Sequence, residues 1–200
     1  MIHFICALKC EASPIIEYYR LSRVKRAVLF SVYSNSSHNI SLTITGIGKL
    51  AAAAATTYSY SIMDCSPGDV WLNLGMAGHR SHAIGDIYLA DRIEDAGNTL
   101  VWYPQLTIES DIPRAGLLSL DRPSTDYGNV MYDMEAAGFI ASACHFTTAE
   151  LSHSIKIISD NQETPAGKIT ARKATDLVAS KKEKIITLAS QLEDLSRELK

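Results

Sequence analysis

Short apolar runs separated by polar or glycine-containing turns predict a chain of alternating strands and helices. The first run, residues 2–8, has the length of a buried strand. Further strand-like runs occupy residues 23–33, 40–44, 70–75, 84–90, 100–103, 116–120 and 154–161. Residues 40–44 alternate between apolar and polar, and the polar turn at 34–39 joins them to residues 23–33 as a predicted hairpin.

Helical patterns fill the spaces between these runs. The first helix is predicted from Pro14 to about Leu21, because proline is tolerated in a first turn. An alanine-rich segment follows Gly48, and an apolar segment follows Asp133. A long closing helix is predicted from about Thr175 to Leu199 on an apolar stripe of Leu177, Ile185, Leu188, Leu192 and Leu195. The pattern favours a three-layer α/β/α fold with a central mixed sheet, in a single domain over residues 1–200, because no repeat or linker divides the chain.

Composition narrows the function. The chain has 200 residues, 46% of them hydrophobic and 20% charged, which is enough for a sizeable core. The net charge of −3 and the absence of a basic stripe argue against a nucleic-acid partner. The four cysteines have no zinc or redox spacing, so we expect buried reduced thiols. His79 and His82 are interpreted as loop residues, and no metal is expected. No apolar run is long enough to span a membrane and no signal peptide is recognisable, so a cytoplasmic location is expected.

Two small-residue turns follow predicted strands. Gly46 and Gly48, with Thr45 before them, separate the strand at 40–44 from the alanine-rich helix. A ribose or anion contact is one interpretation, and a tight turn without a ligand is the more common one. The second turn, residues 76–79, follows the strand at 70–75. If both turns lie at the same sheet edge, they form one crevice.

Three acidic residues are expected at that edge. Glu11 follows the first strand, and Asp160 ends the strand at 154–161. Asp133 is predicted to cap the central helix, which places Glu135 in its first turn, where the helix dipole should keep it ionised. Ligands of open α/β sheets bind beyond the carboxyl ends of the strands. A fixed carboxylate such as Glu135 suits a sugar diol, because it can accept two hydroxyl hydrogen bonds at once. The alternative for each is a helix cap or a surface acid.

Five short motifs occur in an order that resembles one superfamily. They are Thr45-Gly46-Ile47-Gly48-Lys49, Asn73-Leu74-Gly75-Met76-Ala77-Gly78, Ile84-Gly85-Asp86-Ile87, Asp133-Met134-Glu135-Ala136 and Ile158-Ser159-Asp160. Together they resemble the nucleoside phosphorylase and nucleosidase superfamily, with its phosphorylase/hydrolase-like fold. The greatest similarity is to the methylthioadenosine/S-adenosylhomocysteine nucleosidase branch, and the resemblance covers nearly the whole chain.

The resemblance implies cleavage of the N-glycosidic bond of a nucleoside, with purine as the expected base. Glu135 would bind the ribose hydroxyls, and Met134 would pack against the sugar. Asp160 would protonate the leaving base as general acid, and Glu11 would activate the attacking water. The other pocket positions implied are Thr45, Gly46, Ala77 and Gly78. The resemblance also implies a small-molecule substrate, no cofactor, and a homo-oligomer of two or more subunits.

Two other functions remain open at this point. A phosphorylase would need cations for phosphate, and the candidates are Arg20, Arg23, Lys49 and Arg80. Glu11 would repel phosphate, which favours hydrolysis. The other function is nucleoside binding without catalysis.

The sequence departs from the family between Asp91 and Asp133. This span is shorter than usual, and its strand end, residues 120–123, lacks the aromatic side chain that stacks on the base. Candidates to hold the base instead are Trp102, Tyr103 and Phe139.

Overall fold

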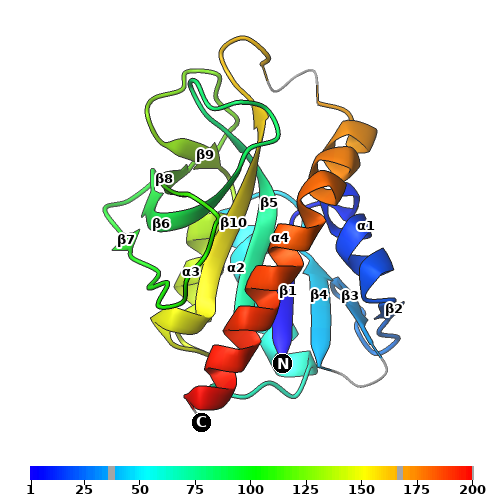
Figure 1. The fold of residues 1–200 in the computed structure, drawn as a ribbon. Coiled ribbons are helices and arrows are strands. Elements are labelled where there is room, and N and C mark those ends of the chain that lie inside the picture. The colour runs from blue at the N-terminus through cyan, green and yellow to red at the C-terminus, as the bar shows by residue number, and fades with distance from the viewer. Residues whose placement is uncertain (36–38, 166–168, 200) are drawn as a thin grey trace.

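The protein is described by a computed structural model for residues 1–35, 39–165 and 169–199 (Figure 1). The strands are β1 Ile2–Cys6, β2 Ser22–Arg23, β3 Ser31–Ser34, β4 Ile40–Ile44, β5 Val70–Gly78, β6 Ile87–Asp95, β7 Val101–Trp102, β8 Arg114–Ser119, β9 Met131–Asp133 and β10 Ser152–Asp160. The helices are α1 Lys9–Tyr18, α2 Lys49–Ile62, α3 Ala136–Ala143 and α4 Ala171–Glu198, with a short 3₁₀ helix at Ala149–Leu151. Part of the predicted turn, residues 36–38, lies outside the described residues.

The strands form one mixed sheet, as the sequence predicts. β1 lies between β4 and β5 and is parallel to both, and β3 pairs antiparallel with β4 as the predicted hairpin. β5 also pairs with β10, and the pairing continues through β6, β8 and β9 back to β5. That half of the sheet is therefore closed into a ring, which the sequence pattern did not indicate.

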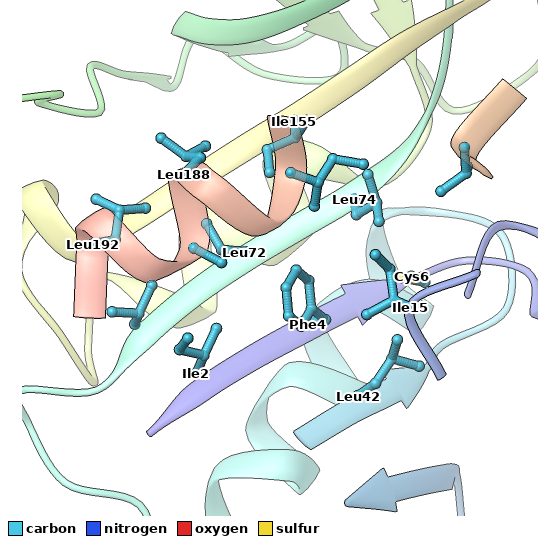
Figure 2. Packing of buried hydrophobic residues seen from close by; sticks show 14 of the residues in the cluster. Ile2, Phe4, Cys6, Ile15, Leu42, Leu72, Leu74, Ile155, Leu188 and Leu192 are labelled. Atoms are coloured by element: carbon cyan, nitrogen blue, oxygen red, sulfur yellow. The ribbon is translucent and has the colours of Figure 1, made fainter. Parts of the chain in front are cut away.

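Helices cover both faces of the sheet (Figure 1). α1 and α4 pack on one face, and α2 and α3 pack against each other on the other. Ile2 and Phe4 of β1 belong to the core cluster beneath α4, to which Leu188 and Leu192 of that helix also contribute (Figure 2). Ile5, the residue after Phe4, belongs to the core cluster that contains the buried residues of α3. This alternation is the two-residue period of a strand covered on both faces. The predicted apolar stripe of the closing helix is confirmed.

The first helix begins at Lys9, so the prediction of a start near Pro14 is wrong. Glu11 fixes the earlier start, because its Oε2 accepts a hydrogen bond of 2.9 Å from the backbone N–H of Leu8, as in a capping box. Pro14 therefore lies inside α1, where it has no N–H for the carbonyl of Cys10. The hydroxyl of Thr175 on α4 donates to that carbonyl at 2.9 Å instead.

Three predicted strands differ from the structure. The strand expected at 84–90 is β6, which begins at Ile87 and continues to Asp95. Residues 23–33 are two short strands rather than one, and Val28 and Leu29 between them are 79% and 74% exposed. β5 continues through Gly78, so residues 76–78 are strand and not turn.

The central helix also starts later than predicted. Asp133 ends β9 instead of occupying the cap position, and α3 begins at Ala136. Asp133 still serves the helix, since its Oδ2 accepts the N–H of Ala136 at 2.8 Å. Glu135 occupies the N-cap position, and its side chain is free to point elsewhere. The closing helix begins at Ala171, capped by Thr170, several residues before the expected start. Within the described residues, no helix combines the length and the hydrophobicity that crossing a membrane requires.

Candidate active site

The three acidic residues singled out in the sequence line one pocket of about 340 Å³. Glu11 comes from the first turn of α1, Glu135 from the start of α3, and Asp160 from the last position of β10. β1, β5 and β10 are parallel, so their carboxyl ends open onto the same edge of the sheet. The fold therefore brings together side chains that are far apart in the sequence.

Glu11 is held rigidly and is nearly buried, with 5% exposure. Its Oε2 accepts the N–H of Leu8, and its Oε1 accepts the N–H of Met76 at 3.2 Å. Burial raises the pKa of Glu11 to about 7, although the Leu8 hydrogen bond and the nearby ammonium of Lys156 oppose the change. A carboxyl group with this pKa exchanges protons near neutral pH.

Glu135 lies at the start of α3, and its side chain also contacts the start of α2. Its Oε1 accepts the N–H of Gly48 at 2.9 Å, and Gly48 is the N-cap residue of α2 with a φ of 108°. Burial raises the pKa of Glu135, against the lowering effects of Lys156 and the Gly48 hydrogen bond. The shift is opposite to the one expected from the helix dipole, because desolvation outweighs it.

Lys156 is the buried cation of the site, and the sequence analysis missed it. The residue is 0% exposed, and its Nζ lies 2.7 Å from Oδ2 of Asp133. Burial alone would lower the pKa of Lys156, but Asp133, Glu135 and Glu11 together raise it above its usual value. One ammonium therefore balances several carboxyl groups. The available signal was a single charged residue within the apolar run of β10.

Asp160 is held between two hydroxyl groups. Tyr127 donates its hydroxyl to Oδ2, and Ser159 donates its hydroxyl to Oδ1. The backbone carbonyl of Asp160 accepts the N–H of His79 at 3.1 Å. Tyr127 belongs to the connection between β8 and β9, which the sequence analysis left without a role.

The other predicted pocket residues divide into two groups. Met134, Ala77 and Gly78 line the pocket. Thr45 and Gly46 are absent from the lining among the described residues, and Ile47 takes that place. The hydroxyl of Thr45 is used locally, since it donates to the carbonyl of Gly46 at 2.5 Å.

The aromatic side chains proposed for the base lie elsewhere. Phe139 is 0% exposed in the core, Tyr103 is 62% exposed, and neither they nor Trp102 are among the described residues that line the pocket. The rings that do line it belong to Tyr127 and Tyr132, with centroids 5.9 Å apart.

The cations proposed for phosphate are also outside the pocket lining of the described chain; they are Arg20, Arg23, Lys49 and Arg80. Lys49 is engaged with Asp95 and, at 2.7 Å, with Asp121. Arg122, exposed on the connection between β8 and β9, is a lining residue that the sequence analysis did not consider.

One group of described residues has donor atoms close enough to hold a metal ion, namely His3, Cys65 and Asp69. It lies at the amino ends of β1 and β5, away from the pocket. Asp69 already accepts hydrogen bonds from the terminal amine of Met1 at 2.9 Å and from the N–H of Ser66 at 2.8 Å, so the cluster works as a structural network.

The expectation for the two histidines is confirmed, and the expectation for the cysteines is corrected in part. His79 and His82 are loop residues whose rings stack with their centroids 3.5 Å apart. All four cysteines are free, but the expected burial holds for Cys6 and fails for Cys144, which is exposed.

Comparisons with known proteins identify the fold. No family model matches the chain, and no curated protein matches it. The 5′-methylthioadenosine/S-adenosylhomocysteine nucleosidase from Helicobacter pylori, solved with butyl-thio-DADMe-Immucillin-A, matches with a TM-score of 0.74 and 13% identity, over 95% of this chain and 97% of that one. The 5′-methylthioadenosine nucleosidase from Arabidopsis thaliana matches with a TM-score of 0.74 and 15% identity, over 96% of this chain and 95% of that one. The 5′-methylthioadenosine/S-adenosylhomocysteine nucleosidase from Colwellia psychrerythraea, solved with adenine, matches with a TM-score of 0.73 and 16% identity, over 96% of this chain and 95% of that one. This chain therefore has the α/β fold of the methylthioadenosine nucleosidases.

Proposed function

We propose that this protein is a nucleosidase that hydrolyses the N-glycosidic bond of a purine nucleoside and releases the free base. The observation that carries the proposal is the convergence of Glu11, Glu135 and Asp160 on one pocket. A pocket lined by three acidic groups in different surroundings suits a reaction that needs a base, a sugar-binding carboxylate and an acid.

Each group has a role in the proposed reaction. Asp160 protonates the leaving base, because a purine leaves poorly as an anion. Glu135 accepts hydrogen bonds from the ribose hydroxyls and stabilises the positive charge that develops on the sugar. Glu11 takes a proton from the attacking water, and its pKa of about 7 suits a general base at neutral pH.

The substrate we expect is a nucleoside of the kind bound by the structural neighbours. Their names specify methylthioadenosine and S-adenosylhomocysteine as substrates, and one was solved with adenine. The fold and the pocket support the same class here. A cytoplasmic location and a homo-oligomeric assembly remain predictions from the sequence.

Hydrolysis is favoured over phosphorolysis. The cations considered for phosphate lie outside the lining formed by the described residues. Lys156 is beside the acids but is paired with Asp133. An incoming phosphate would also meet the carboxylate of Glu11.

The test is release of free base from a panel of nucleosides, with and without phosphate, followed by chromatography. We expect release of adenine from 5′-methylthioadenosine or S-adenosylhomocysteine without phosphate. An absolute phosphate requirement would show a phosphorylase, and binding without turnover would show a binding protein.

Asp160→Asn provides the matching variant. We expect it to fold and to lose turnover, because an amide cannot deliver the proton. Asp176→Asn is the control, since Asp176 is exposed on α4 and lies outside the pocket lining. Turnover by Asp160→Asn at the parent rate would show that the acid is another group.

A further inference from the structure

Tyr127 presents a buried phenol to the carboxyl group that the proposed function uses as its acid. The residue is 4% exposed, lines the pocket, and donates its hydroxyl to Oδ2 of Asp160. Ser159 donates its hydroxyl to Oδ1. Each carboxyl oxygen thus has one donor from the protein and keeps a second lone pair. Asp160 can therefore carry a proton toward the pocket while both hydroxyl groups remain bonded to it.

The chain around Tyr127 is arranged to permit this contact. A Cβ at Gly78 would lie 2.5 Å from Cε1 of Tyr127 and 2.6 Å from Oδ2 of Asp160, so a larger residue on β5 would push the two groups apart. The neighbouring Gly128 donates its N–H to the hydroxyl of Tyr132 at 3.0 Å. These contacts hold an irregular connection in place beside the end of β10.

The phenol is kept in its donor form. Burial raises the pKa of Tyr127, and the hydrogen bond to Asp160 and the charge of that carboxylate raise it further. Tyr127 therefore keeps its proton at neutral pH and serves as a hydrogen-bond donor rather than as the acid itself.

The proposed reaction changes the strength of this hydrogen bond. The O–H bond of Asp160 breaks as an N–H bond forms on the purine, and the glycosidic C–N bond breaks with its electron pair moving to the base. Water adds to the sugar carbon and gives its proton to Glu11. Negative charge develops on Asp160, and a hydrogen bond to an ionised acceptor is roughly twice as strong as one to a neutral acceptor. An interaction that strengthens on the way to the transition state raises kcat.

We propose that Tyr127 is a positioning residue that orients the carboxyl group of Asp160 and stabilises the negative charge this group acquires as it protonates the leaving base. This inference rests on the proposed nucleosidase function and deepens it.

The experiment is Tyr127→Phe, which removes the hydroxyl and keeps the ring. We expect kcat for the nucleoside to fall about 10- to 100-fold, the loss that corresponds to one hydrogen bond to a charged group, while KM changes little. A purely structural role would instead change KM together with kcat.

A second substrate separates the chemical role from a folding defect. The phenolate of 4-nitrophenyl riboside leaves without a proton, so Tyr127→Phe and Asp160→Asn should both cleave it about as fast as the parent. Equal losses on the nucleoside and on this riboside would overturn the inference.

Two further variants complete the design. Ser159→Ala removes the other donor to Asp160 and should lower kcat for the nucleoside while 4-nitrophenyl riboside is still cleaved about as fast as by the parent. Tyr58→Phe is the control, because the Tyr58 hydroxyl accepts from the N–H of Val28 and lies outside the pocket lining.

The outcomes for the inference and for the proposed function are distinct. If the parent releases base, Asp160→Asn does not, and Tyr127→Phe matches the parent in kcat, the inference is wrong and the function stands. If the parent releases no base from any nucleoside, the proposed function is wrong and the inference falls with it.

Discussion

Lys156 gives the sharpest test of the electrostatics of the site. Its side chain is 1% exposed and that of Asp133 is 0% exposed, with 2.7 Å between their charged atoms. Lys156→Met keeps most of the buried side-chain volume and removes the charge. Removing one partner of a buried ion pair typically costs about 3–5 kcal/mol, because the other charge stays buried without compensation. We expect a loss of unfolding free energy in this range at neutral and alkaline pH.

The loss should depend on pH with a definite sign. Lys156 lowers the pKa values of Glu11 and Glu135, so both rise further in the variant. The native variant then binds more protons than its unfolded chain does, and its stability falls as pH rises through that window. The deficit relative to the parent should therefore be smaller at about pH 5.5 than at about pH 8, since each unit of pKa shift is worth about 1.4 kcal/mol.

Urea unfolding at the two pH values, followed by the fluorescence of the buried Trp71, measures both effects. Lys184→Met is the control, because Lys184 forms an exposed pair with Asp111 and its removal should change stability little. Adding Asp133→Asn to Lys156→Met should restore part of the loss. A loss below about 1 kcal/mol at both pH values, or one that grows in acid, would refute the electrostatic account.

Three further outcomes follow from the site and its supporting helices. Gly138→Ala should lower unfolding free energy by more than about 2 kcal/mol, because its Cβ would lie 1.9 Å from the carbonyl of Lys49, and an unchanged melting temperature would contradict the packing of α3 on α2. The specificity constant kcat/KM should decrease as the pH is lowered from about 8 to about 6, because Glu11 becomes protonated near pH 7. A flat profile over this range would argue against the role of Glu11 as base. Glu135→Gln should weaken nucleoside binding about tenfold with little change in free-base binding, measured by calorimetry, and equal losses for both would remove the ribose role.

The sequence predicted the architecture well because hydrophobic periodicity records burial directly. The apolar runs gave β1, β4 and β10 nearly as they are, and the stripe from Leu177 to Leu195 gave α4. Boundaries were less accurate where a side chain reorganises the backbone. Glu11 starts α1 at Lys9 by binding the N–H of Leu8, and this overrides the preference of Pro14 for a first turn.

The acids could be proposed from sequence, but their surroundings could not. Asp160, Glu11 and Glu135 each follow or precede a recognisable strand or helix. In the sequence, Lys156 is a single charged residue within an apolar strand. Its role in the site depends on the ion pair with Asp133, which lies 23 positions earlier in the printed sequence. Tyr127 reaches Asp160 only because of the path of an irregular connection, and no periodicity encodes such a path.

Pro14 has no N–H to donate to the carbonyl of Cys10, and this carbonyl instead ties α1 to another helix. Since the carbonyl of Cys10 is taken by Thr175, the turn that carries Glu11 is fastened to α4 immediately beside Ala174, which lines the pocket. The far end of α4 is fastened too, through the hydroxyl of Ser196 on the carbonyl of Gly68. Pro14 thus couples the position of the proposed base to the docking of the last helix, so loosening α4 would displace Glu11 and slow the reaction before it unfolded the protein.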